Sequence, residues 1–423
     1  MKRRMIVGER IMYVDALTPL NCVFAVKICG SFSREALHKA LFKLQQKHPL
    51  LRSSIKTYGN GVPYFVSSNR INEIPVRVQE RMGDEDWQEQ SRLEWERLFD
   101  GENMPLARVV WLKGTAVSEL LLVCPHCVCD GTTFVTLMRE LLMLLDQPGL
   151  ELDSYQTFGS IESLLAPTFS RSTGKVFKAK FFAMLARLFF LLKSTRREQP
   201  VGKTYMLHWK LNADDTGALT AACRTAGATV HAALCVAFLD AFKQVRGAKA
   251  HGKVICPVDV RKFVPEIKAD HMFAFAPIAE LSLNPKMGGD LWTKARRLKD
   301  DLVKKVAEMK VHELLVMSEY FHASVSRMVR FLRSTDGTHD VTLSNMGRLP
   351  IPGGYSSFEV ETIYSPTVGF PWRNANTLVV STFKDEMDFT FFSNDAFLAE
   401  EEARAIKEAA MVILLKELEP SYV

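Results

Sequence analysis

The most informative part of the sequence is an apolar run followed by a polar turn, Leu120-Leu121-Leu122-Val123-Cys124-Pro125-His126-Cys127-Val128-Cys129-Asp130-Gly131. A continuous apolar run is typical of a β-strand that is covered on both faces. We expect a helix to begin near Thr132 or Thr133, because apolar residues then recur on one side, at Phe134, Leu137, Met138, Leu141, Leu142 and Leu145. The turn thus follows the carboxyl end of a buried strand, a common position for reactive groups in α/β layers.

Strands and helices alternate on both sides of this turn. In the first half, a β-rich run at 23–28 precedes a helix that His48-Pro49 ends, and strands are also predicted around 109–112. In the second half, strands are predicted at 205–211, 254–259, 341–345, 378–383 and 387–392, and helices at 214–226, 230–245, 292–311 and 400–418. The pattern predicts an α/β (α+β) protein with two mixed-sheet sandwich lobes.

Domain boundaries follow from composition. The predicted N-terminal lobe spans 1–165, a basic amphipathic linker spans 166–200, and the C-terminal lobe spans 201–423. The formal net charge is +6, but residues 171–197 within the linker contain no acidic residue and eight cations, at Arg171, Lys175, Lys178, Lys180, Arg187, Lys193, Arg196 and Arg197. The rest of the chain therefore carries −2, which argues against a general nucleic-acid-binding protein.

The lack of a secretory signal and the pattern of cysteines suggest a reducing compartment. The basic N-terminus lacks the uninterrupted apolar stretch of a secretory signal, and no run is long enough to span a bilayer. The eight cysteines are expected to be free thiols, and the protein a cytoplasmic monomer. Residues 176–193 leave two interpretations open: a helix that covers the linker or the site, or a helix on an anionic inner-membrane surface.

His126 and Asp130 stand four residues apart, directly before Gly131. An imidazole can accept a proton from a hydroxyl or amine near neutral pH, whereas Asp130 is better placed to hold the loop in shape. Gly131 permits a backbone angle or a close approach that a side chain would block. The plain alternative is a surface histidine followed by an ordinary turn and helix cap, and spacing alone leaves both open.

His126-x-x-x-Asp130-Gly131 matches the HxxxDG signature of the chloramphenicol acetyltransferase-like superfamily, which includes condensation domains and several acyltransferase families. Four further segments resemble this group in the right order: 41–52 with its His-Pro-x-Leu-Arg ending, 228–234, Pro257-Val258-Asp259-Val260-Arg261, and Leu343-Ser344-Asn345-Met346-Gly347-Arg348. Together these segments span nearly the whole chain. The sequence is most similar to free-standing alcohol O-acetyltransferase and polyketide-associated types.

The resemblance implies two lobes with a tunnel between them and His126 at its middle. His126 would act as general base on an alcohol or amine acceptor, which attacks a thioester donor. The donor would be a co-substrate, acyl-CoA or the phosphopantetheine thioester of an acyl carrier protein, and no cofactor would stay bound. Ser344 and Asn345 are candidate oxyanion donors. Candidate partners for Asp130 are Arg52, Arg261 and Arg348, of which Arg52 is favoured.

Some features depart from the family pattern. Pro125 replaces the second histidine of condensation domains, the plant DFGWG segment is absent, and no carrier or adenylation segment is recognised. Cys124, Cys127 and Cys129 flank His126 without a second ligand cluster in the sequence, so no metal site is predicted. The intact motif favours acyl transfer in lipid or secondary-metabolite synthesis over a non-catalytic protein that binds or gates an acyl carrier.

Overall fold

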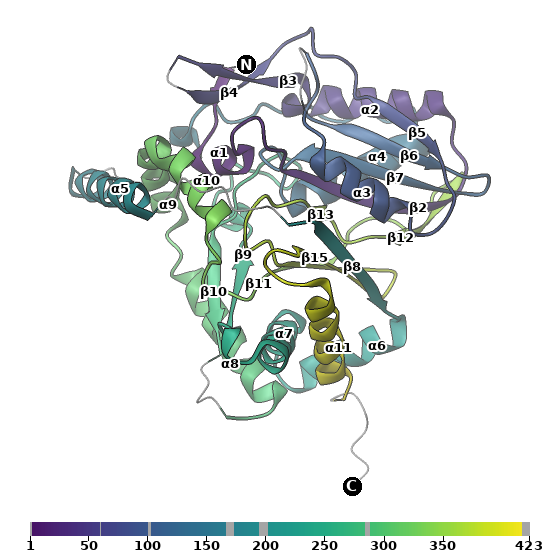
Figure 1. Ribbon diagram of the computed structural model, residues 1–423. Helices are drawn as coiled ribbons and strands as arrows, with labels where there is room; N and C mark the ends of the chain where they lie inside the picture. The colour runs from purple at the N-terminus through teal and green to yellow at the C-terminus, as the bar shows by residue number, and fades with distance from the viewer. Residues whose placement is uncertain are drawn as a thin grey trace.

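The computed structural model describes residues 2–59, 61–99, 103–165, 173–193, 202–283 and 288–416, and it has two mixed-sheet lobes (Figure 1). The predicted fold class is confirmed. The first sheet has the order β12-β2-β7-β6-β5, with β13 also paired to β2. Its strands are β2 (Asn21–Gly30), β5 (Val76–Glu80), β6 (Arg108–Lys113), β7 (Val117–Pro125), β12 (Phe358–Ile363) and β13 (Thr367–Val368).

The second sheet has the order β10-β9-β11-β14-β15-β8. Its strands are β8 (Thr204–Leu211), β9 (Lys253–Pro257), β10 (Ile278–Ser282), β11 (Val341–Arg348), β14 (Thr377–Phe383) and β15 (Glu386–Asn394). A small third sheet joins β1 (Lys2–Arg4), β4 (Val62–Ser67) and β3 (Ser53–Tyr58). Each large sheet has its own hydrophobic core, as two α/β lobes require.

Helices cover both sheets. In the first lobe, α2 (Arg34–Lys47) and α4 (Gly131–Asp146) pack together, and α3 (Asp86–Glu96) lies between the first sheet and β8. In the second lobe, the helices gather below the sheet in Figure 1; they are α6 (Ala213–Thr225), α7 (Val230–Arg246), α8 (Leu291–Ala307) and α11 (Glu400–Lys416). A third group flanks the lobes and comprises α1 (Val7–Tyr13), α5 (Thr173–Lys193), α9 (Val311–Ser318) and α10 (Val325–Ser334). Short 3₁₀ turns occupy Pro49–Arg52, Ile161–Leu164, Gly247–Lys249, Val260–Lys262 and Glu319–Ser324 (η5).

The local sequence explains the segment that leads to the turn at His126. β7 is buried almost throughout and lies between β2 and β6, which accounts for its apolar run. In α2, Ser33 accepts a hydrogen bond from the Ala36 backbone N–H, and the apolar residues at helical spacing face the core. Phe24 of β2 meets Phe134 of α4 edge-on, with ring centroids 6.1 Å apart.

The chain crosses back from the second lobe to the first. β12 pairs antiparallel with β2, from Phe358 opposite Gly30 to Ile363 opposite Val26, and β13 pairs with the start of β2. The sequence pattern predicts no strand here and places 201–423 wholly in the C-terminal lobe. The predicted lobe boundary therefore does not separate two self-contained sheets, because β12 and β13 complete the first sheet. Without them, the edge of β2 would be open.

Other predictions shift by small amounts. The charged helix expected over 292–311 ends at Ala307, and Val311 starts a separate helix. The expected linker contains α5, at 173–193. The flanking cations Arg171, Arg196 and Arg197 of the basic segment, the side chain of Lys175 and the predicted lobe boundaries at 166 and 201 lie outside the described residues.

A buried polar network joins α2 to α4. Glu140 accepts hydrogen bonds from Lys47 Nζ at 2.6 Å and from His48 Nε2 at 2.8 Å, and all three side chains are buried. His48 Nδ1 also lies 3.0 Å from the hydroxyl of Tyr155. Lys47 reaches Asp270 of the second lobe at 2.9 Å, so this network also holds the two lobes together.

Candidate active site

β7 delivers His126 to the place where the lobes meet. The strand ends at Pro125, and the His126 backbone N–H donates to Leu20 O at 2.8 Å. Asp130 then caps α4 by accepting a hydrogen bond from the Thr133 backbone N–H at 2.8 Å. The strand, turn and helix predicted for this segment are confirmed, and they fix the His126 loop at both ends.

One hydrogen bond orients the His126 ring. Its Nδ1 lies 2.9 Å from Cys129 O, and a carbonyl oxygen can only accept, so Nδ1 carries the proton. In the neutral imidazole the lone pair is then on Nε2, as a general base requires. The ring is partly exposed and lies 5.7 Å from the Phe370 ring, centroid to centroid.

Cys22 is a neighbour of His126 that no local sequence pattern indicates. Burial alone lowers the pKa of His126, but the charge and hydrogen bond of Cys22 raise it to about 9. Burial raises the pKa of Cys22, whereas hydrogen bonds from Cys129 and the charge of His126 lower it to about 6. Cys22 and His126 therefore titrate as a coupled pair in which each group favours the charged form of the other, and the neutral form of the His126 ring is the one that can accept a proton.

Asp130 pairs with Arg261 of the second lobe. Arg261 Nη1 lies 2.5 Å from Asp130 Oδ2, and Nη2 lies 3.3 Å from Oδ1. The preference for Arg52 is wrong, because Arg52 instead lies 3.5 Å from Gln46 Oε1. Arg348 is also excluded, since it pairs with Asp385 on the surface.

The Asp130–Arg261 pair is part of a connection between the lobes. Arg261 Nη2 donates to His271 O at 2.9 Å, and Nη1 lies 3.3 Å from Asp259 Oδ1. Asp259 in turn accepts a hydrogen bond from the Thr132 hydroxyl at 3.0 Å. Charge-assisted bonds of this kind resist displacement, so they hold the start of α4 against the second lobe.

Gly131 lies against β11 of the second lobe. A Cβ at this position would sit 3.3 Å from Met346 Cε, closer than ordinary packing distance, so the predicted close approach is present. Ser344 lies two residues earlier on β11, with its neighbour Leu343 buried in the second-lobe core. Ser344 therefore points away from that core, by strand alternation. Asn345 accepts the Gly347 backbone N–H at 2.9 Å, at the point where the register of β11 shifts between Asn345 and Arg348.

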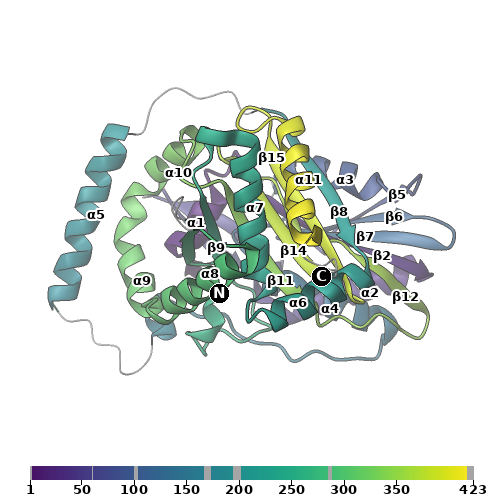
Figure 2. The ribbon, with the colours of Figure 1, turned by 90° about the horizontal axis from the view of Figure 1, so that it is seen from below.

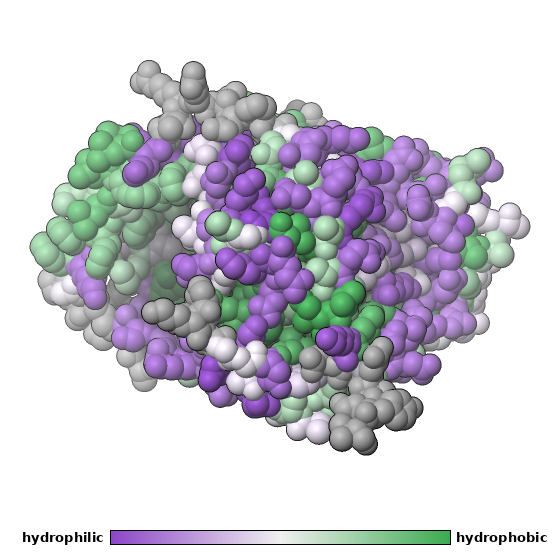
Figure 3. All heavy atoms as spheres, turned by 60° about the horizontal axis from the view of Figure 1, so that its bottom comes forward, coloured by the Kyte–Doolittle hydropathy of each residue, from purple (hydrophilic) through white to green (hydrophobic). Residues whose placement is uncertain are grey.

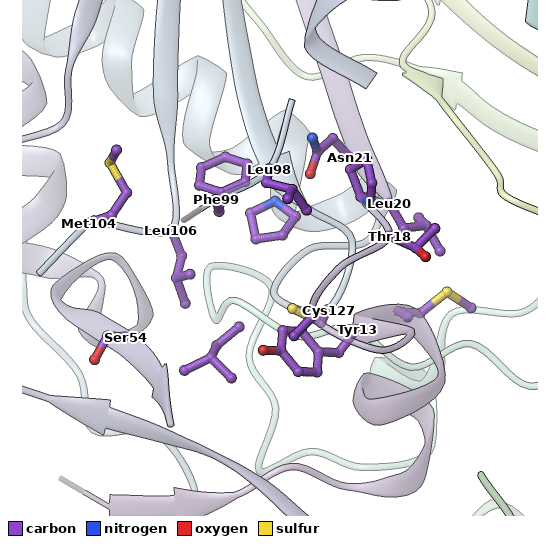
Figure 4. A pocket seen from close by; sticks show the side chains of 15 residues that line it. Tyr13, Thr18, Leu20, Asn21, Ser54, Leu98, Phe99, Met104, Leu106 and Cys127 are labelled. Carbon is purple, nitrogen blue, oxygen red and sulfur yellow. The ribbon is translucent and has the colours of Figure 1, made fainter. Parts of the chain in front are cut away.

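A cavity lies beside the His126 loop. Its volume is about 100 Å³. His126 does not line it; Figure 4 shows lining side chains that include Tyr13 and Cys127, close to one another, and Leu20 and Leu106. This small cavity is large enough for a few heavy atoms. It is not the expected tunnel with His126 at its middle, and that tunnel stays a prediction.

Two sets of metal-ligand atoms come together in the described residues, although the sequence predicted no metal site. Cys22, His126 and Cys129 form one set and His231, Cys235 and Cys256 the other, with the ligand atoms of each set within 4.8 Å of one another. Of the cysteine run around His126, only Cys129 takes part. Each set combines residues from separate elements, which is why spacing could not reveal it. Either set has the donor types of a zinc site, with three ligands rather than four.

Comparisons with known proteins agree on the fold. The family described as phthiocerol/phthiodiolone dimycocerosyl transferase C-terminus matches residues 201–389. The trichothecene 15-O-acetyltransferase of Fusarium sporotrichioides is 16% identical with a TM-score of 0.72, and the match covers 98% of this chain and 95% of that one. Polyketide synthase associated protein 5 of Mycobacterium tuberculosis is 16% identical with a TM-score of 0.69, over 100% and 98%.

A condensation domain shares the architecture as well. The domain from the Monacolin K polyketide synthase is 13% identical with a TM-score of 0.68, over 100% of this chain and 98% of that one. A search of curated protein sequences found no match. At these identities the solved structures establish a common fold, and the chemistry has to be argued from the side chains around His126.

Proposed function

We propose that this chain, which has the fold of condensation domains and related acyltransferases, is a member of the chloramphenicol acetyltransferase-like superfamily. It transfers an acyl group from a thioester to a hydroxyl or amine, with His126 as general base. The observation that supports this most is the hydrogen bond from His126 Nδ1 to Cys129 O. It leaves Nε2 as the proton-accepting atom of the neutral ring.

The proposed reaction needs no covalent enzyme intermediate. His126 Nε2 takes the proton from the acceptor O–H or N–H as the acceptor oxygen or nitrogen attacks the thioester carbonyl carbon. The tetrahedral intermediate collapses by breaking its C–S bond, and the thiolate that leaves takes the proton back from His126. The products are an ester or amide and a free thiol.

The developing oxyanion needs a hydrogen-bond donor. Ser344 is the better of the two predicted candidates, because it lies on β11 near the contact between Met346 and Gly131 and faces away from the second-lobe core. The side-chain oxygen of Asn345 is engaged by Gly347, although its amide nitrogen could still donate. Asp130 and Arg261 act as positioning residues that keep the His126 loop in place.

Cys22 offers a second route through the same reaction class. Its proximity to His126 resembles a nucleophile–base pair, in which the acyl group would pass through a Cys22 thioester. We favour direct transfer, because Cys22 is 5% exposed and lies within the first-lobe core. A substrate carbonyl would have to enter that core to be attacked.

The donor and acceptor can be identified with a substrate panel. Purified protein is mixed with acyl-CoA thioesters of increasing length, or with an acylated carrier protein, and with simple alcohols and amines. Thiol release and product mass are followed, together with the mass of the intact protein. We expect ester or amide product with no acylated protein. Accumulation of an acyl adduct on wild type that Cys22→Ser abolishes would instead indicate the covalent route. The absence of product with both donor types would favour a non-catalytic protein that binds an acyl carrier.

A further inference from the structure

Helix α5 projects from the body of the protein. Figures 1 and 2 show it at the edge of the molecule from two directions, away from both sheets. Its contacts are with η5 and α10. Phe189 and Phe190 meet the Phe331 ring of α10, each with centroids 5.6 Å apart. One side of α5 therefore packs against η5 and α10. The role of the opposite side does not follow from these contacts.

The anchored side of α5 is made mainly of small residues. The least exposed positions recur at helical spacing and are Val176, Ala179, Ala183, Ala186 and Phe190. A helix that served only to cover the body would bury its largest apolar residues, because burial of apolar area provides most of the packing free energy. α5 has the opposite arrangement.

Large apolar residues lie on the outer side instead. Phe177 and Leu192 are 72% and 74% exposed, and the same face also exposes Phe181, Met184, Leu185, Leu188 and Leu191. Figure 3 shows this as a group of hydrophobic atoms on the projecting helix. A contiguous exposed patch of this kind marks an interaction surface, whereas single exposed apolar residues do not.

The charges of the helix are all positive. Lys178, Lys180, Arg187 and Lys193 are exposed, and the range 173–193 contains no Asp or Glu. Arg330, exposed on the adjoining α10, adds a cation without an ion-pair partner among the described residues. A surface that combines large apolar residues with cations matches a lipid surface with anionic headgroups, into which the apolar side chains insert while the lysine and arginine heads stay at the phosphates.

From these observations we infer that α5 binds the surface of an anionic lipid bilayer and lies flat along it. Among the described residues no single helix is long and apolar enough to cross a bilayer. Ala213–Thr225 and Val230–Lys249 reach the required length and hydropathy only together, as a pair bent by 101°. A flat orientation also suits the fold, because the inner side of α5 stays on η5 and α10. These two elements contact α1, whose Met12 and Tyr13 line the cavity beside His126. The proposed lipid-binding helix is thus connected through η5 and α10 to the helix that lines this cavity.

Co-sedimentation with vesicles tests this inference. The full chain is mixed with vesicles of phosphatidylglycerol and phosphatidylcholine in equal parts, or of phosphatidylcholine alone. We expect wild type to sediment with the mixed vesicles, and Leu188→Glu to bind about tenfold more weakly or worse, since an apolar anchor becomes an anion. Lys180→Glu should weaken binding to the mixed vesicles more than any binding to vesicles of phosphatidylcholine alone. Met82→Glu is the control, because Met82 is also a large apolar residue and is 81% exposed, against 54% for Leu188, but lies outside α5. His126→Ala should bind like wild type, because vesicle binding does not depend on the chemistry.

Three results would overturn the inference. Wild type could fail to sediment with the mixed vesicles, or Leu188→Glu could sediment as well as wild type. Alternatively, wild type could self-associate in sedimentation velocity without vesicles, Leu188→Glu could remain monomeric, and neither could bind lipid. In that case the outer face of α5 would be an interface with a second copy.

Discussion

Replacing Arg261 by alanine should destabilise the protein by about 2–4 kcal/mol. Arg261 and Asp130 are 7% and 16% exposed, and their closest atoms are 2.5 Å apart. Removing one partner of a fully buried pair costs about 3–5 kcal/mol, because an uncompensated charge stays behind. The residual exposure of Asp130 lets water compensate in part, which reduces the expected cost.

The chain contains a matched control for this change. Arg348 and Asp385 are also 2.5 Å apart, but they are 67% and 65% exposed. Exposed pairs contribute about 0–1 kcal/mol, so Arg348→Ala should have almost no effect on the free energy of unfolding. The two pairs share the same chemistry and the same separation, and burial is the property that differs.

Urea denaturation of the single and double variants measures both pairs. A double-mutant cycle for Arg261→Ala and Asp130→Ala should give a coupling free energy of about 2 kcal/mol, well above that for Arg348→Ala and Asp385→Ala. Asp130→Ala should also lose the cap of α4, worth about 1 kcal/mol. Equal coupling free energies for the two pairs would refute the view that Arg261 locks the His126 loop against the second lobe.

Two further predictions concern buried charges. Cys22→Ser should lower the pKa of His126, because it removes the thiolate that raises this pKa to about 9 and leaves burial, which lowers it. The acid limb of the pH profile of kcat/KM should therefore move to lower pH, and an unchanged limb or one at higher pH would contradict this. Glu140→Ala should cost about 3–5 kcal/mol in urea denaturation, since Lys47 and His48 lose their shared partner. A cost below about 1 kcal/mol would show that the network adds little stability.

Local patterns predicted the strand, turn and helix around His126 because each signal lies within a few residues. The apolar run fixes a buried strand, and Asp130 followed by Thr133 is an ordinary helix cap. β12 was missed although apolar and polar residues alternate along it, from Phe358 to Ile363. The signal was present, but it is short, and nothing local indicates that this strand joins the sheet of the other lobe.

Long-range contacts were the main limit. The sequence offered three arginines for Asp130, and each lies in a segment that resembles the family. Choosing among them requires the relative placement of the lobes, which depends on packing across both cores. The same holds for Cys22, which approaches His126 because β2 pairs antiparallel with β7, with Asn21 opposite Pro125. No spacing rule connects residues so far apart in the chain.

The most direct test of the proposed chemistry compares His126→Ala with wild type in single-turnover acyl transfer from a thioester that the panel identifies. His38→Ala serves as the control, since the partly exposed His38 lies on α2, where Arg34 Nε lies 3.5 Å from its Nε2. We predict that His126→Ala loses roughly 10²-fold or more in rate while keeping its fold, and that His38→Ala keeps the wild-type rate. Equal rates for wild type and a folded His126→Ala variant would contradict the assignment of His126 as the general base.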